Sequence, residues 1–99
     1  MEKIWIVLQE SNVDGEIITN VVPCISEETA KAIMDEEIRT LLSDGKYEGL
    51  DLDEIERDQN DANADCDFYL ERDDTTFFLN CLYDDYYEKI DILEKEIQF

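Results

Sequence analysis

The sequence contains no histidine, three glycines, one proline and three cysteines in 99 residues. Without histidine there is no Ser-His or Cys-His pair for nucleophilic catalysis, and a common zinc ligand is missing. Neither Gly15 nor Gly45 belongs to a glycine-rich phosphate-binding loop. We therefore expect a protein that is not an enzyme and that holds no cofactor.

Basic residues are also scarce, because eight Lys and Arg stand against 28 Asp and Glu, for a formal net charge of -20. Nucleic acids and anionic membranes are bound through cationic side chains, so direct binding to either is not expected. A basic protein partner is expected instead. A plain solvated surface is the alternative, although so many like charges destabilise a small compact domain.

Long apolar runs are absent from the sequence, and none approaches the roughly 20 residues that a membrane helix needs. The first residues, MEKIWIVLQES, have no basic leader and no small-residue cleavage site, so we expect a soluble cytoplasmic protein. Cys24, Cys66 and Cys81 are odd in number and lie in apolar patterns. This favours free thiols in a reducing compartment, with one disulfide as the alternative.

The clearest element that is present is an amphipathic helix within residues 26–45. Ser26 suits the N-cap and Gly45 suits a left-handed C-terminal exit. The apolar positions recur at three- and four-residue steps: Ala30, Ile33, Met34, Ile38, Leu41 and Leu42.

Alternating patterns predict strands on both sides of this helix. Residues 3–9 and 16–22 should form a hairpin around a turn at 11–15, with Pro23 ending the ladder. Residues 66–71 and 76–82 should form a second hairpin.

The weakly patterned segment 46–65 is expected to be a loop with at most one short helical turn or edge strand. The last segment, EKIDILEKEIQF (88–99), fits both a helix and a strand that changes face at a bulge, and we prefer the strand. The predicted fold is one α+β domain over residues 1–99. It is an antiparallel sheet of about four or five strands with one helix packed across it.

Four short stretches carry a resemblance to known proteins: ESNVDGE (10–16), PCISEE (23–28), YDDYYE (83–88) and EKEI (94–97). They resemble a group of short, acidic, uncharacterised bacterial proteins often found with mobile elements, and the resemblance attaches no function. In size and charge the chain also resembles phage-borne inhibitors such as anti-CRISPR proteins, many of which are small acidic α+β domains. That second resemblance carries over no residue.

Candidate partner contacts follow from the densest acidic segment, residues 46–74, which holds twelve acidic and three basic residues, and from the tyrosines near residue 86. Aromatic rings beside carboxylates can anchor an interface, because the rings bury area while the acids meet Lys or Arg. The alternative for the rings is that one or two of them close the core. The candidate partner-binding residues are Asp51, Asp53, Glu54, Asp58, Asp61, Asp65, Asp84, Asp85, Tyr86 and Tyr87.

A calcium-type loop is imitated by the oxygen-bearing residues Asp61, Asn63, Asp65 and Asp67. The sixth position is Cys66 instead of glycine and the twelfth is Arg72 instead of glutamate, so the sharp turn and the bidentate ligand are missing. We expect a solvated loop and no metal site. A weak carboxylate cation binder, recognisable by a melting temperature that rises with calcium, stays as the third hypothesis.

Two other functional hypotheses rank above cation binding. In the first, the acidic surface imitates nucleic acid and docks on a basic protein such as a nuclease. Duplex DNA carries one charge per about 1.7 Å, so twenty charges match roughly 34 Å of it. In the second, the chain is a non-catalytic interaction module read through its tyrosines and hairpin edges, with acidity serving solubility. The first predicts steeply salt-dependent binding and the second does not.

Overall fold

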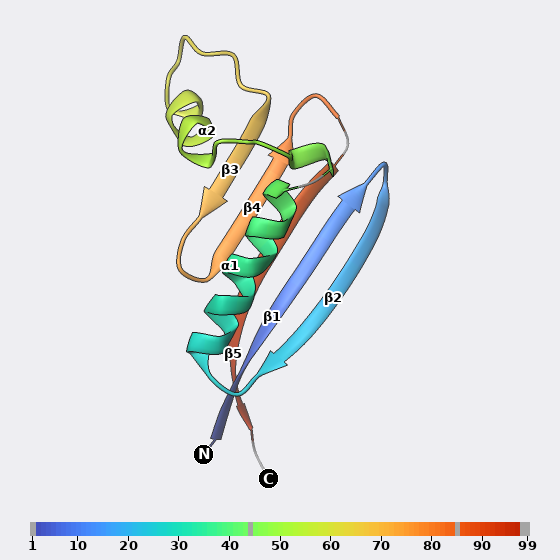
Figure 1. Cartoon of the computed structure of the whole chain (residues 1–99), viewed down its shortest axis with the longest axis vertical. Helices are drawn as coiled ribbons and strands as arrows, with labels where there is room; N and C mark the ends of the chain where they lie inside the picture. Colours follow the sequence, from blue (N-terminus) through green and yellow to red (C-terminus); the bar gives the residue numbers. More distant parts are fainter. Residues whose placement is uncertain (1, 44, 85, 98–99) are drawn as a thin grey trace.

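The computed structural model describes residues 2–43, 45–84 and 86–97 of the chain. In order these residues form β1 (Glu2–Val13), β2 (Glu16–Cys24), α1 (Glu27–Ser43), the 3-10 turn η1 (Gly45–Tyr47), α2 (Leu52–Gln59), β3 (Phe68–Arg72), β4 (Thr76–Cys81) and β5 (Tyr86–Ile97). The strands form one antiparallel sheet in the order β2-β1-β5-β4-β3 (Figure 1). The predicted α+β sheet of four or five strands with a helix across it is confirmed.

The first hairpin is longer than its sequence pattern predicts. Asp14 and Gly15 both have positive φ, as a two-residue type I′ turn requires, so β1 continues through Ser11 to Val13. The predicted turn over 11–15 is therefore too wide. Pro23 does not end the ladder either, since it pairs with Ile6 inside β2. Because β2 is an edge strand, a residue without an N–H is tolerated there.

Helix α1 begins and ends as predicted. The Ser26 hydroxyl accepts a hydrogen bond from the Thr29 N–H at 3.1 Å, and Gly45 has a φ of +75° at the exit. Ala30 and Met34 are buried against the sheet, and α1 lies along β1, β2 and β5. The amphipathic pattern thus fixes which side of the helix meets the sheet.

Strand β5 is the centre of the sheet and pairs with β1 along its whole length and with β4. The strand preferred for the last segment is confirmed, while the helix alternative is wrong. The register with β1 runs without interruption from Tyr86 to Ile97, so the expected bulge is absent from this stretch. Leu93 simply points to the other side from Ile92, and its side chain is 39% exposed.

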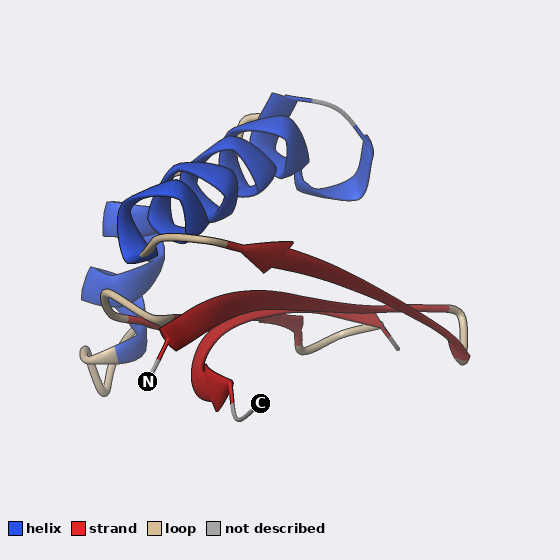
Figure 2. Ribbon diagram, turned by 90° about the horizontal axis from the view of Figure 1, so that it is seen from below, coloured by secondary structure: helices blue, strands red, loops and turns tan. Residues whose placement is uncertain are grey.

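The two faces of the sheet differ, because α1 lies across one side only, while α2 stands at the β3 edge (Figure 2). The covered face supplies the core: Val7, Leu70, Phe77, Leu79, Cys81, Tyr86, Ile90 and Ile92, packed with Ala30 and Met34. The opposite side, which we call the open face, carries residues of the other parity, including Ile6, Leu8, Phe78 and Tyr87.

Helix α2 is more than the single turn that the sequence predicts, and it covers the β3 edge of the sheet. The Gln59 side-chain amide donates to the Leu70 carbonyl at 2.8 Å, and the Leu70 N–H donates to the Gln59 Oε1 at 2.9 Å. A side chain therefore takes the place of a neighbouring strand at this point. Edge groups paired in this way cannot recruit another chain.

The structure also tests the predictions of free cysteines and of no membrane-spanning helix. Cys24, Cys66 and Cys81 are all free, with Cys24 and Cys81 buried, so the disulfide alternative is not realised. No helix in residues 2–43, 45–84 or 86–97 is long and apolar enough to cross a membrane.

A carboxylate lies in the core. Glu88, on the covered face of β5, is 7% exposed, and its Oε2 accepts a hydrogen bond from the Ser11 hydroxyl at 2.5 Å. Burial raises the pKa of the Glu88 carboxyl, the Ser11 hydrogen bond partly offsets this, and the charge of Glu37 raises it further. Burial and the Glu88 charge also raise the pKa of the Tyr47 hydroxyl. The charged form of Glu88 is therefore less favoured in the folded domain than that of an exposed Glu.

Glu88→Gln is expected to stabilise the domain at pH 7 by about 1 kcal/mol, because it removes a buried charge and keeps an acceptor for Ser11. The folded-state pKa is raised, so the contribution of Glu88 to stability is complete below the ordinary Glu pKa and is lost as pH rises through the folded pKa. The advantage of the variant should shrink as pH falls toward the ordinary value. Urea unfolding of both proteins at the two pH values measures this, and a variant less stable than wild type at pH 7 would contradict it.

Candidate partner-binding surface

Five acidic residues line a hollow of about 280 Å³ beside α2, which we call the α2 pocket. Its rim is acidic and its floor is mostly apolar. The rim residues are Asp51, Glu54, Asp58, Asp65 and Asp67, and the other lining residues are Gly49, Leu50, Ile55, Cys66 and Phe68.

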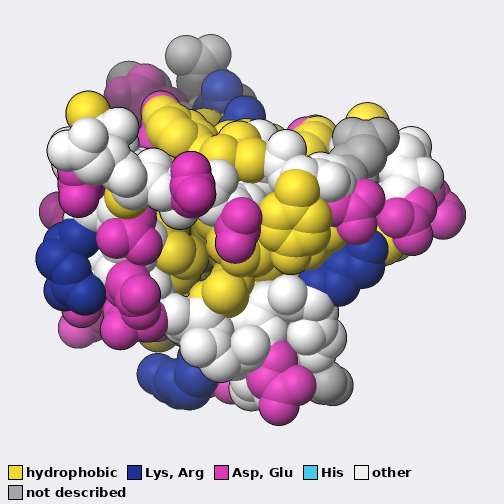
Figure 3. Space-filling view, turned by 90° about the horizontal axis from the view of Figure 1, so that it is seen from above, with side chains coloured by type: hydrophobic (Ala, Val, Ile, Leu, Met, Phe, Trp, Pro, Cys, Tyr) yellow, Lys and Arg dark blue, Asp and Glu magenta, His cyan; other side chains and the backbone are white. Residues whose placement is uncertain are grey.

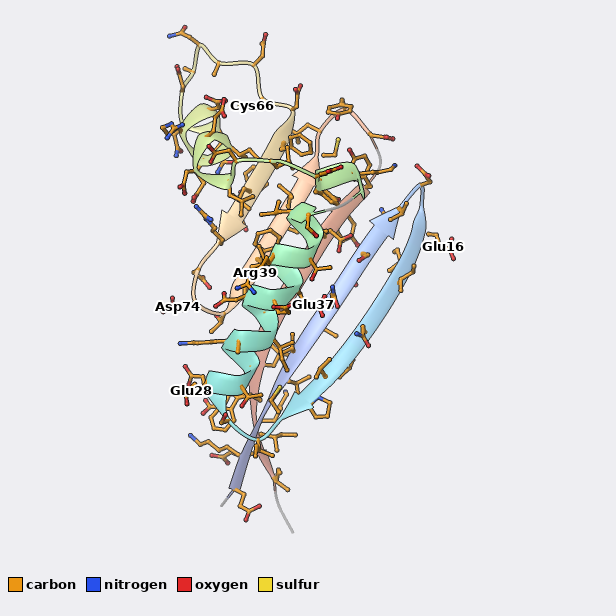
Figure 4. All side chains as sticks on the ribbon, viewed as in Figure 1. Glu16, Glu28, Glu37, Arg39, Cys66 and Asp74 are labelled. Carbon is orange, nitrogen blue, oxygen red and sulfur yellow. The ribbon has the colours of Figure 1, made fainter. Side chains whose placement is uncertain are left out.

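The sequence builds the rim from two segments. Asp51 is the N-cap of α2, and its Oδ1 accepts from the N–H groups of Asp53 and Glu54 at 3.1 and 3.2 Å. Glu54 and Asp58 then follow at helical spacing, so the three carboxylates share one side of the helix. Asp65 and Asp67 come from the loop that returns to β3, with Cys66 between them beside α2 (Figure 4).

The chemistry of the α2 pocket matches one kind of side chain. Lys and Arg combine a charged head with an aliphatic stem that covers apolar surface. Leu50, Ile55 and Phe68 would contact the stem, while the surrounding carboxylates would meet the head. The pocket is thus suited to a basic side chain presented by another protein.

A larger hollow of about 350 Å³ lies between α1, α2 and the β3–β4 turn. Lys31 and Arg72 line it together with Asp35, Asp73 and Asp74, over an apolar floor that includes Phe77. Arg72 also forms an ion pair with Asp53 at 2.6 Å. Two cations of the protein itself face its three acids, so this hollow is less acidic than the α2 pocket.

Four of the ten predicted contact residues lie together at the α2 pocket: Asp51, Glu54, Asp58 and Asp65. The others are separate. Asp53 is paired with Arg72, and Asp61 accepts from the Asn63 N–H at 2.9 Å. Asp84 lies 3.8 Å from the Lys46 ammonium, and Asp85 falls outside the described residues.

The two predicted tyrosines lie on opposite faces of β5, and one of them is buried. Tyr86 is 4% exposed, packs edge-on against Tyr47 at 5.4 Å, and has the Lys46 ammonium over its ring at 4.2 Å. Tyr86 therefore closes the core, and we remove it from the candidate contacts. Tyr87 is on the open face, where its hydroxyl donates to Glu10 at 2.5 Å.

The open face is rich in aromatic rings and carries few of the acidic residues in excess. Tyr69, Phe78 and Tyr87 form a row of rings across β3, β4 and β5, with centroids 6.3 and 5.7 Å apart. In the described strands, the charged residues that the register places on this face are four acids and two bases: Glu2, Glu10, Glu71, Asp91, Lys89 and Lys95. Most of the charge excess of the chain therefore lies elsewhere.

The end of the molecule that carries α2 shows this uneven distribution directly. Seen from that end, hydrophobic side chains gather in the middle, with Asp and Glu side chains on both sides of them (Figure 3). Residues 27–74, which contain both helices, hold eighteen acidic and five basic residues. The excess of acidic residues is therefore concentrated on the side of the helices and at the end of the molecule that carries α2.

The calcium-type loop does not assemble as a loop of ligands. Asp65 and Asp67 line the α2 pocket, whereas Asp61 is occupied by the backbone of its own turn. Within the part of the chain that the structure describes, no group of three or more Asp, Glu or Cys side chains is arranged to hold a metal ion.

Sequence reasoning missed the residues that make this surface a pocket. Asp67 completes the rim, and Leu50, Ile55 and Phe68 provide the floor. Leu50 and Ile55 are visible in the sequence as isolated apolar residues in an acidic run. The sequence does not indicate that α2 and the loop before β3 lie side by side.

The fold defines this chain as a small α+β domain, with a five-stranded open sheet covered on one face. No protein-family model, no curated protein and no solved structure matches it.

Proposed function

We propose that this protein is an inhibitor or regulator that docks its acidic surface on a basic, nucleic-acid-binding protein and occupies the groove that nucleic acid would take. The observation that carries the proposal is the α2 pocket, where five carboxylates surround an apolar floor. A basic side chain of the partner fits there better than a free ion, because the floor offers contacts only to an aliphatic stem.

The size of the molecule supports the same proposal. Its longest extent is 53 Å, enough to span the roughly 34 Å of duplex DNA that carries as much charge as the net -20 of the chain. The other extents, 27 and 21 Å, leave a slender body that can enter a groove. The concentration of acids on the helical side gives that body one strongly charged surface.

The proposal is tested by capturing proteins from the native host's lysate on immobilised protein at low salt and eluting them with a salt gradient. A captured protein that binds nucleic acid, elutes late and is displaced by duplex DNA supports it, because the two ligands then share one site. A partner whose affinity stays constant between low and high salt refutes it, since exposed charge pairs are screened by salt.

The second hypothesis, a non-catalytic interaction module, is supported by one observation, the aromatic row of Tyr69, Phe78 and Tyr87. It predicts that the affinity for the partner depends weakly on salt and falls strongly on Tyr87→Ala. Tyr86→Ala is not a usable test, because removing a buried ring would destabilise the fold itself. The same captured partner, measured with Tyr87→Ala at two salt concentrations, separates the two functions.

A further inference from the structure

We propose that two copies of this chain associate through the outer edges of their β2 strands, forming one continuous antiparallel sheet. This goes beyond the proposed function, because it concerns a different surface and a different partner. It rests on the contrast between the two edges of the sheet.

The β3 edge is covered and the β2 edge is not. At β3 the Gln59 side chain pairs with both backbone groups of Leu70, and α2 lies alongside. At the other edge β2 pairs only with β1 in the sheet, and none of the described elements lies beyond it (Figure 1). Every second residue of such a strand turns its N–H and C=O outward.

The uncovered edge is long and apolar. Ile17, Ile18 and Val21 are 59%, 57% and 54% exposed, so both faces of the strand present apolar side chains. Nine residues make β2 longer than a typical strand. Proteins usually blunt exposed edges with charges, bulges or short strands. Apart from Glu16 at its start and Pro23 near its end, β2 has none of these devices.

The absence of charge along β2 indicates what kind of strand can pair with its free edge. Residues 17–26 are the longest stretch of the sequence without a charged residue, in a chain of net charge -20. A basic strand would find no acid opposite it along this stretch. A second copy, in contrast, can approach there without placing two carboxylates directly against each other.

The strand also matches itself. Antiparallel pairing about a two-fold axis at Asn20 places Thr19 opposite Val21, Ile18 opposite Val22 and Ile17 opposite Pro23 of the other copy. These are mostly β-branched and apolar cross-strand pairs, which stabilise a sheet. Only Pro23 fails to donate a hydrogen bond, at the margin of the contact.

Sedimentation equilibrium at about 0.05 M and about 0.5 M salt tests the dimer. Wild type should dimerise, and more tightly at the higher salt, because screening reduces the repulsion between two chains of charge -20. Docking on a basic partner has the opposite salt dependence, so the two proposals succeed or fail separately.

Val21→Lys should weaken dimerisation at least about 10-fold, since it places two ammonium groups in the apolar contact. Leu82→Lys is the matched control: Leu82 is also 54% exposed, lies outside β2, and the charge change is the same. It should leave dimerisation unchanged, and circular dichroism checks that both variants fold.

Three results would overturn this assignment. The first is a wild-type protein that stays monomeric at roughly 0.5 mM and high salt, because that leaves any association too weak to matter. The second is a dimer that Val21→Lys and Leu82→Lys affect equally. The third is a dimer that survives Val21→Lys but is lost on Phe78→Ala, which would assign the contact to the open face.

Discussion

Phe77→Ala is expected to lower the free energy of unfolding by about 3–5 kcal/mol, a large share of the 5–15 kcal/mol that a typical domain possesses. Phe77 is fully buried on the covered face of β4, opposite Ile90 of β5. Met34 and Ile38 of α1 line the same hollow, so the ring joins the helix to the sheet. Urea unfolding followed by far-UV circular dichroism measures the loss.

The neighbouring residue provides the control. Phe78→Ala removes the same side chain one position along β4, from a half-buried place on the open face. There the ring contacts Tyr69 and Tyr87 without a covering helix, so a loss of about 1–2 kcal/mol is expected. Equal losses in the two variants would mean that the covered face and the open face bury their side chains to the same degree, and would contradict the packing of α1 on one face only.

How much of this fold could be predicted depended on how local its causes are. Helix α1 and the two hairpins follow from apolar periodicity and turn residues, which are local. The last segment was ambiguous because Ile90, Leu93 and Ile97 also fit a helical spacing. Pairing with β1, more than seventy residues away, decides it. Helix α2 has Leu52 and Ile55 as its apolar positions, too few for a clear pattern.

The candidate site was predictable in composition but not in geometry. The acidic density of residues 46–74 is visible in the sequence, whereas the convergence of Asp51 and Asp65 requires the loop between them to fold back beside α2. The tyrosines show a second limit. Side chains of a strand alternate, so a shift of one residue exchanges the faces of Tyr86 and Tyr87. The local sequence around Tyr86 and Tyr87 does not determine which face of the sheet α1 covers.

Neutralising the rim of the α2 pocket is expected to weaken binding of a short arginine-rich peptide by about 10- to 100-fold at roughly 0.1 M salt. The variant combines Asp51→Asn, Glu54→Gln, Asp58→Asn and Asp65→Asn. Asn caps a helix as well as Asp does, so α2 should keep its N-terminus. Isothermal titration calorimetry gives the affinity, and the melting temperature checks the fold.

A second variant with the same change of net charge separates the pocket from the overall field. It carries Glu2→Gln, Glu16→Gln, Glu94→Gln and Glu96→Gln, none of which lines the α2 pocket. At this ionic strength a charge more than about 10 Å from a bound ligand is largely screened, so the loss should stay below about 3-fold. Equal losses would show that the peptide senses only total charge. The α2 pocket would then have no claim to be the docking site, because a surface that imitates a nucleic acid for one partner must hold its charges in particular places.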